Sequence, residues 1–333
     1  MDHQARVYDS VLEMLPSEEN PSPVVRLNRM NPAAGAGYTL YAKLEWQNPF
    51  GSVKDRAAAE LVAHLEATGQ LGPGRPGRGI VEPTSGNTGL SLAAICAVKG
   101  YPMRAVVPQK VPPSKKSLLK IAGAELDISQ DAMCPLPGTE DGTIGLARTH
   151  ARASADRYVM PNQYENPINA QAHMRTTGPE IWRQTGGRVT HVFTSLGTCG
   201  TVTGLSRFLK AKNPAVRVIA AQPSPGHDVP GVRNTGELEV SKLYDPSLID
   251  EIVEIPYQVT YDRMLELSRK EGLLAGPSSG LIYEAARRVL SRGPEAGGLV
   301  GGVGVMIFCD SVFKYIANLI KHHPELLAEG AVQ

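Results

Sequence analysis

The sequence predicts an α/β protein made of two three-layer α/β domains with mainly parallel sheets. From residue 50 onward, segments with helical periodicity alternate with short apolar segments, and clusters of Gly, Pro, Ser and Asn separate them. The 333 residues suffice for about two domains. A content of 42% hydrophobic and 20% charged residues is typical of a globular chain.

The first helix of this series is expected to begin beside Ser52 and to carry Lys54 in its first turn. Ser52 and Asp55 match the S-x-x-D pattern of a capping box, apolar residues recur at helical spacing over 58–65, and Gly69 closes the segment. The positive end of a helix dipole disfavours an ammonium ion, so a lysine there is suited to Schiff-base chemistry. A solvated helix lysine is the alternative interpretation.

The remaining elements are expected to alternate in the same way. The expected strands cover residues 79–83, 103–108, 124–129, 158–160, 191–196, 216–222, 250–255 and 303–309. The expected helices cover 91–99, 114–122, 143–155, the stretch from the turn at 197–201 to about 212, 260–271 and 281–291, with two short helices divided at Gly178-Pro179. Residues 131–142 carry prolines and glycines and predict an exposed connection, with a domain boundary soon after it.

Charge, hydropathy and cysteine spacing exclude several classes of protein. The 34 Lys and Arg residues nearly balance 33 Asp and Glu, so no overall field would attract nucleic acid or anionic lipid. The apolar run at 297–309 is too short to span a membrane and no secretory leader is evident, so we expect a cytoplasmic protein. The four cysteines form no C-x-x-C pair, so we expect neither a metal site nor a disulfide framework.

Two strand-to-helix turns carry ligand-binding chemistry. Gly197–Thr201 (G-T-C-G-T) offers backbone N–H groups at a helix N-terminus, two threonine hydroxyls, and glycines that permit close approach, which suits a phosphate monoester. Thr84–Gly89 (T-S-G-N-T-G) offers hydroxyls, an amide and backbone donors, which suits a carboxylate. Taken alone, each is equally compatible with an ordinary strand-to-helix turn.

Together with the lysine segment, these turns occur in an order that resembles the fold-type II pyridoxal-phosphate enzymes, and specifically the cysteine synthase family. Residues 48–56 (N-P-F-G-S-V-K-D-R) are similar to the family's lysine segment. The resemblance implies that Lys54 forms the internal aldimine with pyridoxal 5'-phosphate and is the catalytic base. It also implies that Asn87 binds the cofactor's phenolic oxygen and that Ser278, in G-P-S-S-G, faces its pyridine nitrogen. The alternative for Ser278 is a helix N-cap before Leu281.

The same resemblance assigns the remaining contacts. It implies that the cofactor phosphate is bound by Gly197, Thr198, Cys199, Gly200 and Thr201. It implies that the substrate carboxylate is bound by Thr84, Ser85, Gly86, Asn87, Thr88 and, in N-Q-Y, Gln163. It further implies a smaller, mobile substrate-carboxylate domain over residues 45–155, a larger cofactor-phosphate domain formed by 1–44 and 156–333, an active site between them, and a homodimer.

The match extends from about Pro21 to Tyr315, and residues 176–182 (T-T-G-P-E-I-W) with 222–233 are most similar to the cysteine synthase B branch. Three features depart from the family pattern. Cys199 stands where glycine or threonine is usual, the stretch 131–142 is unusual, and residues 310–315 differ from the ending of the branch. Arg233 occupies a place where the branch carries an arginine. It either binds an anionic group of the substrate or is a solvated surface arginine.

We therefore expect a pyridoxal-phosphate enzyme that replaces the β-substituent of O-acetylserine or O-phosphoserine through an aminoacrylate. Sulfide or thiosulfate as the sulfur donor would give L-cysteine or S-sulfocysteine. An amine or homocysteine would instead give a diaminopropionate-type product or cystathionine, and the sequence does not separate these. A non-catalytic ligand-binding or regulatory paralogue is the alternative of another class, and the intact Lys54, Asn87 and Ser278 argue against it.

Overall fold

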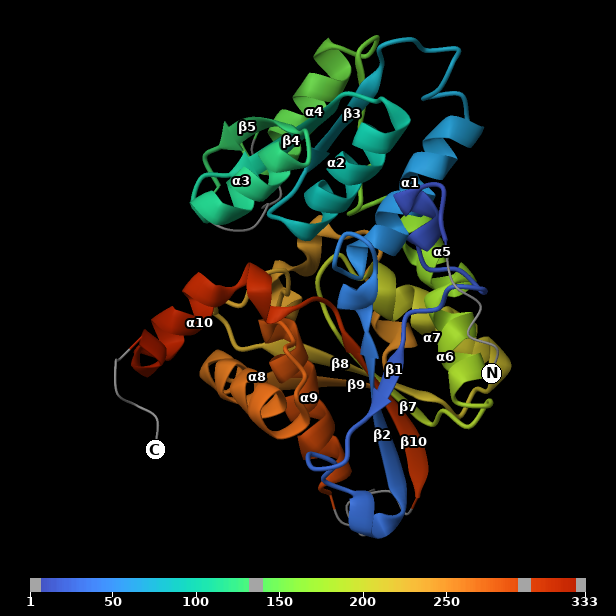
Figure 1. The fold of residues 1–333 in the computed structure, drawn as a ribbon, viewed down its shortest axis with the longest axis vertical. Helices are drawn as coiled ribbons and strands as arrows, with labels where there is room; N and C mark the ends of the chain where they lie inside the picture. Colours follow the sequence, from blue (N-terminus) through green and yellow to red (C-terminus); the bar gives the residue numbers. More distant parts are fainter. Residues whose placement is uncertain (1–6, 132–139, 293–300, 328–333) are drawn as a thin grey trace.

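The computed structural model describes residues 7–131, 140–292 and 301–327 and arranges them around two β-sheets (Figure 1). The six-stranded sheet has the strand order β1-β2-β10-β7-β8-β9, and the four-stranded sheet has the order β5-β4-β3-β6. Every pair of neighbouring strands is parallel except β1 with β2. The predicted α/β class with mainly parallel sheets is therefore confirmed.

The strands of the two sheets come from different parts of the chain. The six-stranded sheet contains β1 (Val24–Arg26), β2 (Tyr38–Leu44), β7 (His191–Ser195), β8 (Arg217–Pro223), β9 (Glu251–Ile255) and β10 (Gly302–Phe308). The four-stranded sheet contains β3 (Gly79–Pro83), β4 (Met103–Pro108), β5 (Glu125–Ser129) and β6 (Tyr158–Val159). The sequence did not predict β1 or β2, and β2 pairs with β10 along its whole length.

The helices connect these strands. The α-helices are α1 (Lys54–Ala67), α2 (Asn87–Lys99), α3 (Pro113–Ile121), α4 (Thr143–Ala153), α5 (Ile168–Arg175), α6 (Thr177–Gln184), α7 (Gly200–Lys212), α8 (Tyr257–Glu271), α9 (Pro277–Leu290) and α10 (Ile316–His322). Short 3-10 helices lie at Val11–Met14, Ala34–Ala36, Glu45–Gln47, Thr235–Val240, Pro246–Leu248, Val312–Lys314 and Pro324–Leu327. Within the described ranges, no helix combines the length and the apolar character that a membrane span requires.

Helices cover both faces of each sheet. Because successive side chains of a strand point to opposite faces, Met306 and Phe308 of β10 join a core with α8 and α9, whereas Val305 and Ile307 join a core with α6 and α7. In the four-stranded sheet, α1 and α2 pack on one face and α4 packs on the other. Both units therefore have three layers, as predicted.

Two helices begin four residues earlier than the apolar periodicity predicts. The sequence places their starts near Ser91 and Leu281, whereas α2 begins at Asn87 and α9 begins at Pro277. The first turn of each is polar or rich in glycine, so the apolar pattern starts one turn late. Most of the expected connection at 131–142 lies outside the described residues.

The expected division of two short helices at Gly178-Pro179 is wrong. The boundary lies at Thr176, between α5 and α6, and Gly178-Pro179 lies inside the first turn of α6. Proline is tolerated there because the N–H groups of a first turn have no partner within the helix. A Cβ on Gly178 would lie 2.7 Å from Cδ1 of Phe208, so glycine at this position allows α6 to pack closely against α7.

Candidate active site

One pocket collects residues that follow the carboxyl ends of strands in both sheets. Strand β3 leads into the turn at 84–88, β7 leads into the turn at 197–201, and β10 leads into Cys309 and Asp310. Ligands of open parallel α/β sheets bind at this edge. The empty volume of this pocket, open solvent included, is about 940 Å³.

The structure brings nearly all of the predicted site residues together in this pocket. They are Lys54, Thr84, Ser85, Gly86, Asn87, Thr88, Gln163, Gly197, Thr198, Cys199, Thr201, Arg233 and Ser278. Gly200 does not line the pocket. A Cβ at that position would lie 2.1 Å from Oδ1 of Asn169, so Gly200 allows the turn to pack closely against α5.

Lys54 is the first residue of α1, as expected, but the predicted capping box is wrong. Ser52 Oγ accepts from the N–H of Lys54 at 3.2 Å. The Asp55 carboxylate accepts from the N–H of Phe50 at 2.8 Å and from the hydroxyls of Ser91 at 2.6 Å and Ser52 at 3.4 Å, and not from the N–H of Ser52 as a capping box requires. Asp55 is buried between the preceding turn and α2, and this burial raises its pKa to about 6. These contacts fix the turn that carries Lys54.

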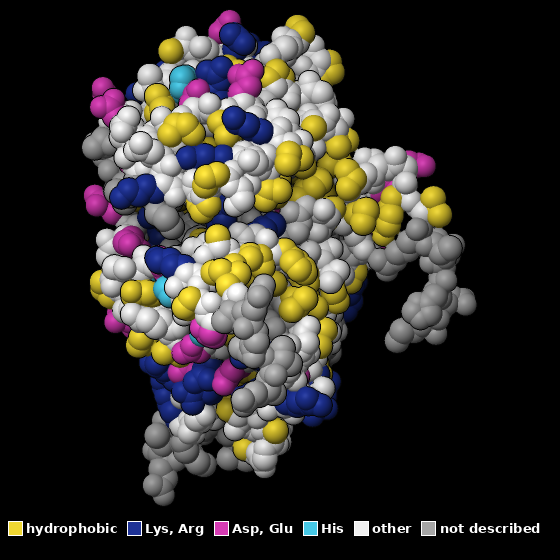
Figure 2. Space-filling model, turned by 60° about the vertical axis from the view of Figure 1, so that its left-hand side comes forward, with side chains coloured by type: hydrophobic (Ala, Val, Ile, Leu, Met, Phe, Trp, Pro, Cys, Tyr) yellow, Lys and Arg dark blue, Asp and Glu magenta, His cyan; other side chains and the backbone are white. Residues whose placement is uncertain are grey.

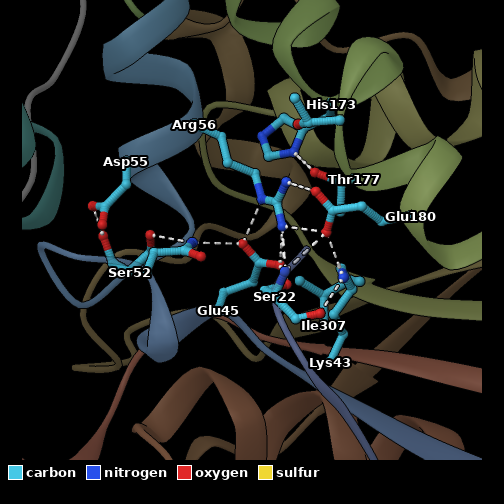
Figure 3. Close-up of polar contacts among 12 residues, drawn as sticks. Ser22, Lys43, Glu45, Ser52, Asp55, Arg56, His173, Thr177, Glu180 and Ile307 are labelled. Atoms are coloured by element: carbon cyan, nitrogen blue, oxygen red, sulfur yellow. Dashed lines mark hydrogen bonds and ion pairs between the residues drawn. The ribbon is translucent and has the colours of Figure 1, made fainter. Parts of the chain in front are cut away.

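A buried ionic cluster anchors α1 two residues after Lys54 (Figure 3). Arg56 Nε lies 2.7 Å from Oε2 of Glu45, Arg56 Nη1 lies 2.6 Å from Oε1 of Glu180, and Lys43 Nζ lies 2.7 Å from Oε2 of Glu180. Burial opposes ionisation of Glu45, but the charge and hydrogen bonds of Arg56 lower its pKa to about 2. Two cations thus balance two carboxylates, and loss of one partner would cost about 3–5 kcal/mol.

The turn after β3 uses a side chain to satisfy its backbone. Thr84 Oγ1 accepts from the N–H of Gly86 at 3.1 Å and from that of Gly89 at 3.0 Å. It therefore caps α2, whose N-cap residue Gly86 has no side chain to do so. A Cβ on Gly89 would lie 2.4 Å from Cγ2 of Thr84, so glycine is required for this close packing.

Gln163 connects this turn to a buried carboxylate. Its Oε1 accepts from the hydroxyl of Thr88 at 2.6 Å, and its Nε2 donates to the carbonyl of Pro83 at 3.0 Å. The N–H groups of Asn162 and Gln163 each donate to one oxygen of Glu82 at 2.9 Å. Glu82 is fully buried, and burial raises its pKa to about 7. The Gln163 side chain is thus held between Thr88 and β3.

The turn after β7 leaves the N-terminus of α7 facing the pocket. Its N-cap residue, Cys199, has a φ of 63° and makes no side-chain cap. The first N–H groups of a helix have no partner within it, and Thr198 and Thr201 add hydroxyls to the same pocket wall. A Cβ on Gly197 would lie 2.8 Å from the carbonyl oxygen of Gly231. These donors carry no net charge and suit a phosphate ester.

A neutral histidine supports the same turn, and the sequence analysis missed it. His173 Nε2 lies 3.2 Å from Oγ1 of Thr201, and its Nδ1 lies 2.8 Å from Oγ1 of Thr177 (Figure 3). Burial lowers the pKa of His173 to about 3, so the ring is uncharged at neutral pH. His173 lies near the end of α5 and Thr177 is the first residue of α6, and their spacing of four residues is the signal that could have indicated this pair.

Ser278 lies in the first turn of α9 and faces the pocket. Gly276 is the N-cap and Pro277 is the first helical residue, so the N-cap alternative for Ser278 is wrong. Proline is common at the first position of a helix because it has no N–H group that would need a hydrogen-bond partner there. Ser278 is 6% exposed and lies beside Cys309, whose thiol pKa burial raises to about 11. Both groups are therefore neutral.

Arg233 is buried in the pocket wall, so the interpretation as a solvated surface arginine is wrong. It is only 4% exposed. Its N–H donates to the carbonyl of Leu196 at 2.8 Å, which ties the segment to the end of β7. Its guanidinium carbon lies 5.8 Å from the centre of the Tyr164 ring, and Nη1 donates to the carbonyl of Glu237 at 3.5 Å.

Asn87 has two partners that the sequence analysis did not identify. Its Nδ2 donates to Oδ2 of Asp310 at 2.6 Å, and its Oδ1 accepts from Nζ of Lys314 at 3.0 Å. Asp310 also lines the pocket, together with the unpredicted Lys115 and Tyr315. The position of Asp310 directly after a buried parallel strand is a signal that could have revealed it.

The donor chemistry of the pocket fits pyridoxal 5'-phosphate. A primary amine from Lys54, an amide from Asn87, a neutral hydroxyl from Ser278 and the neutral donors of the 197–201 turn open onto one cavity. Across residues 7–131, 140–292 and 301–327, His, Cys, Asp and Glu side chains form no group of three or more that could hold a metal ion.

Comparison with known proteins leads to the same cofactor. The family model described as "Pyridoxal-phosphate dependent enzyme" matches residues 15–310. Cysteine synthase B of Escherichia coli (strain K12) is 39% identical over 299 residues, which cover 89% of this chain and 92% of that protein. The structure of an O-ureido-L-serine synthase is 30% identical with a TM-score of 0.82, and 98% of each chain is covered.

A further structure, cysteine synthase from Entamoeba histolytica, is 28% identical with a TM-score of 0.81, covering 96% of this chain and 93% of that one. The family match thus spans most of the chain, and the similarity to cysteine synthase B extends over nearly all of it. On this sequence and structural similarity, the chain belongs to the pyridoxal-phosphate-dependent enzyme family, within its cysteine synthase B branch.

Proposed function

We propose that this protein catalyses β-replacement on an activated serine. Acetate or phosphate would leave the β-carbon, and a sulfur nucleophile would add to give L-cysteine or S-sulfocysteine. The observation that carries the proposal is the convergence of Lys54, Asn87, Ser278 and the 197–201 turn on one pocket. Relatives named cysteine synthase and cysteine synthase B support the same class of reaction.

Besides Lys54, three parts of the pocket would hold the cofactor. The N–H groups at the start of α7, with the hydroxyls of Thr198 and Thr201, would bind its phosphate. Asn87 would donate to its phenolic oxygen, and the Ser278 hydroxyl would meet its ring nitrogen. Pyridoxal phosphate, when bound, supplies an electron sink for the α-carbon of an amino acid. A neutral Ser278 stabilises a positive ring nitrogen less than a carboxylate would, which favours rapid departure of the β-substituent.

Lys54 would both bind the cofactor and move the α-proton. Once the amino group of the substrate has replaced it, the free Nζ of Lys54 would act as the base that removes the proton from the α-carbon. Two features hold its backbone in place for this. The N–H of Val53 donates to the carbonyl of Cys309 at 2.8 Å, and Arg56 is fixed in its ionic cluster.

The turn at 84–88 and Gln163 would bind the substrate carboxylate. Gln163 Nε2 gives one N–H to the carbonyl of Pro83, and its second N–H is then available to an incoming oxygen. The hydroxyl of Ser85 and the backbone of the turn line the same wall. These groups carry no charge, so the carboxylate would be held by hydrogen bonds from neutral donors.

Arg233 would bind an anionic group on one of the two substrates. Arg233 is buried in the pocket wall and places a fixed positive charge there. The neutral acetyl group of O-acetylserine and the small sulfide ion would form few hydrogen bonds with its guanidinium. The phosphate of O-phosphoserine and the sulfonate end of thiosulfate are the groups that a guanidinium binds through paired hydrogen bonds. We propose that one of these is the physiological substrate.

Two further properties belong to the proposal. The first is a mobile, smaller domain over about residues 45–155, with β6 of the same sheet following it in the chain. The second is a cytoplasmic homodimer. Exposed apolar side chains on and near α3 and α10 are Leu118, Ile121, Phe313 and Ile316. Figure 2 shows hydrophobic side chains gathered on one side of the molecule. Light scattering after size exclusion, with Ile121→Asp as the disrupting variant, would measure the state of assembly.

The test pairs each activated serine with each nucleophile. The holoenzyme is mixed with O-acetylserine or O-phosphoserine, and sulfide, thiosulfate, homocysteine or ammonia is added separately. We expect cysteine or S-sulfocysteine to be the product formed fastest, identified by mass. A faster reaction with an amine or with homocysteine would contradict the proposed nucleophile. Absence of turnover with every nucleophile would contradict the proposed β-replacement activity.

A further inference from the structure

Residues 309–315, which follow β10, contact all three segments that carry Lys54, Asn87 and Ser278. Within this segment, residues 310–315 differ from the ending that is usual in the cysteine synthase B branch. The contacts are made by both backbone and side chains, and two of the side chains, Asp310 and Lys314, have no function in the proposed reaction so far.

The first contact is with the lysine segment. The N–H of Val53 donates to the carbonyl of Cys309 at 2.8 Å, and Ser52 forms an isolated antiparallel bridge with Asp310. Lys314 Nζ donates to the carbonyl of Gly51 at 2.9 Å and to that of Phe50 at 3.3 Å. The turn before Lys54 is therefore held from the C-terminal side of the chain.

The second contact is with the turn before Ser278. The N–H of Gly276 donates to the carbonyl of Asp310 at 2.8 Å, and Ala275 forms an isolated bridge with Ser311. A Cβ on Gly276 would lie 2.1 Å from Oδ1 of Asp310, so glycine at this position leaves room for the carboxylate. The Asp310 side chain is thus fixed beside the start of α9.

The third contact is with the Asn87 amide and involves both charged side chains. A carboxylate only accepts hydrogen bonds, and an ammonium group only donates them. Asp310 Oδ2 therefore selects the nitrogen of the amide, at 2.6 Å, while Lys314 Nζ selects its oxygen, at 3.0 Å. The hydroxyl of Tyr315 donates to the same Asp310 oxygen. With the amide flipped, its oxygen would face the Asp310 carboxylate and its NH₂ group would face the Lys314 ammonium, so neither hydrogen bond could form.

We propose that Asp310 and Lys314 are positioning residues that fix the orientation of the Asn87 amide, so that the second N–H of Nδ2 is presented to the phenolic oxygen of pyridoxal phosphate. This inference rests on the proposed function, in which Asn87 binds that oxygen. Asp310 is 2% exposed, so water competes little for its hydrogen bonds. Through Lys314, the same pair also connects Asn87 to the turn before Lys54.

The test is a double-mutant cycle read by cofactor binding. Equilibrium dialysis measures the dissociation constant of pyridoxal phosphate for wild type, Asp310→Asn, Lys314→Met and Asn87→Ala, and the visible absorption of each holoenzyme is recorded. We expect each single variant to bind the cofactor about tenfold more weakly, with a shifted absorption band. In the Asn87→Ala background, Asp310→Asn and Lys314→Met should add less than about twofold, because their effect passes through the amide.

Lys270→Met is the matched control, since Lys270 is an exposed lysine of α8 that pairs with Glu266 on the same helix. This variant should bind the cofactor as wild type does. Equal losses in the presence and absence of Asn87, or no loss from either charged residue, would overturn the positioning role. Lys54→Ala separates this result from the proposed function. If that variant kept the wild-type band, the proposed cofactor chemistry would itself fail.

Discussion

Two strand-to-helix turns of the pocket share a topology but use their backbone donors in opposite ways. After β3, Thr84 Oγ1 occupies the N–H groups of Gly86 and Gly89, so mainly side chains face the ligand. After β7, Cys199 provides no side-chain cap, and the N–H groups of the first turn of α7 face the pocket. The comparison teaches that topology alone does not define a ligand site. The capping residue decides whether a turn offers its backbone or its side chains.

Both turns are proposed to bind groups of the molecules on which Lys54 acts. Removal of the Lys54 amine should therefore cause the largest loss of activity, and it tests whether the two turns belong to one site. Lys54→Ala should remove the visible absorption of the holoenzyme and lower kcat/KM by at least about a thousandfold, because one amine supplies both the covalent bond and the base. Absorption spectra and steady-state rates measure this, and circular dichroism checks the fold. Near-normal turnover would refute the assignment.

A pair of glycine substitutions breaks the two turns separately. Gly200→Ala places a Cβ 2.1 Å from Asn169 Oδ1, and Gly89→Ala places one 2.4 Å from Thr84 Cγ2. Overpacking of this kind costs about 1–3 kcal/mol. Gly200→Ala should therefore weaken pyridoxal phosphate binding by about 100-fold. Gly89→Ala should raise KM for the amino acid by about tenfold, with cofactor affinity changed less than about threefold.

The two variants are compared by equilibrium dialysis for the cofactor and by initial rates for the amino acid. An equal loss of cofactor affinity in both variants would contradict the proposal that one turn binds the cofactor phosphate and the other binds the substrate carboxylate.

Arg233 sharpens the comparison by adding a charge to a pocket wall otherwise rich in neutral donors. Arg233→Ala should lower kcat/KM for O-phosphoserine or thiosulfate by about ten- to a hundredfold, since a charge-assisted pair is worth about 1.5–3 kcal/mol. O-acetylserine with sulfide should change by less than about threefold. Arg207→Ala removes an exposed arginine of α7 and serves as the control. Equal losses on both substrate pairs would indicate a structural role instead.

Glu82 supports the side-chain turn through Gln163 and gives it a pH dependence. Its pKa is raised to about 7 in the folded protein, above the usual value near 4.3. Between these values the folded state holds a proton that the unfolded chain has released, so stability falls as pH rises. Glu82 should therefore contribute a loss of about 2 kcal/mol between pH 5 and 7.

Urea unfolding of the holoenzyme at pH 5 and pH 7 measures this slope, and Glu82→Gln should remove that share of it. Asp55, whose pKa is raised to about 6, contributes in the same direction and remains in the variant. An unchanged slope in Glu82→Gln would mean that Glu82 stays ionised throughout.

The smallest effect is expected at Cys199. Its φ of 63° lies in the left-handed region that glycine adopts freely, and the turn is proposed to bind phosphate through backbone donors. Cys199→Gly should change the dissociation constant of pyridoxal phosphate by less than about threefold. A loss above tenfold in the same dialysis assay would show that the thiol side chain takes part in the site.

Much of this site could be predicted from the sequence because its signals are local. The glycines and hydroxyls of each turn lie within six consecutive residues, and Ser52 marks the start of the helix two residues before Lys54. The same locality explains the errors. A glycine followed by proline predicts a helix break when the start of the helix is not known. Because α6 begins at Thr177, Pro179 lies in its first turn, where proline is tolerated.

What could not be predicted depends on contacts between distant residues. Strand β2 contains Lys43, which reads as exposed until Glu180 is known to lie 2.7 Å away. Asp310 and Lys314 read as surface charges of a C-terminal segment until the fold places Asn87 between them. Burial of Arg233 likewise follows from packing against Tyr164 and the end of β7.

The place of β10 in the larger sheet has a consequence for how the protein is made. This strand lies between β2 and β7 at the centre of the sheet, yet it spans Gly302–Phe308 and, among the strands of the described residues, is the last to be synthesised. The four-stranded sheet draws only on residues up to Val159 and can form during synthesis. The larger sheet stays divided until its central strand emerges, and Asp310 and Lys314 arrive just after it. The nascent chain therefore cannot complete its cofactor pocket before Gly302–Phe308 and the segment that follows it have been synthesised.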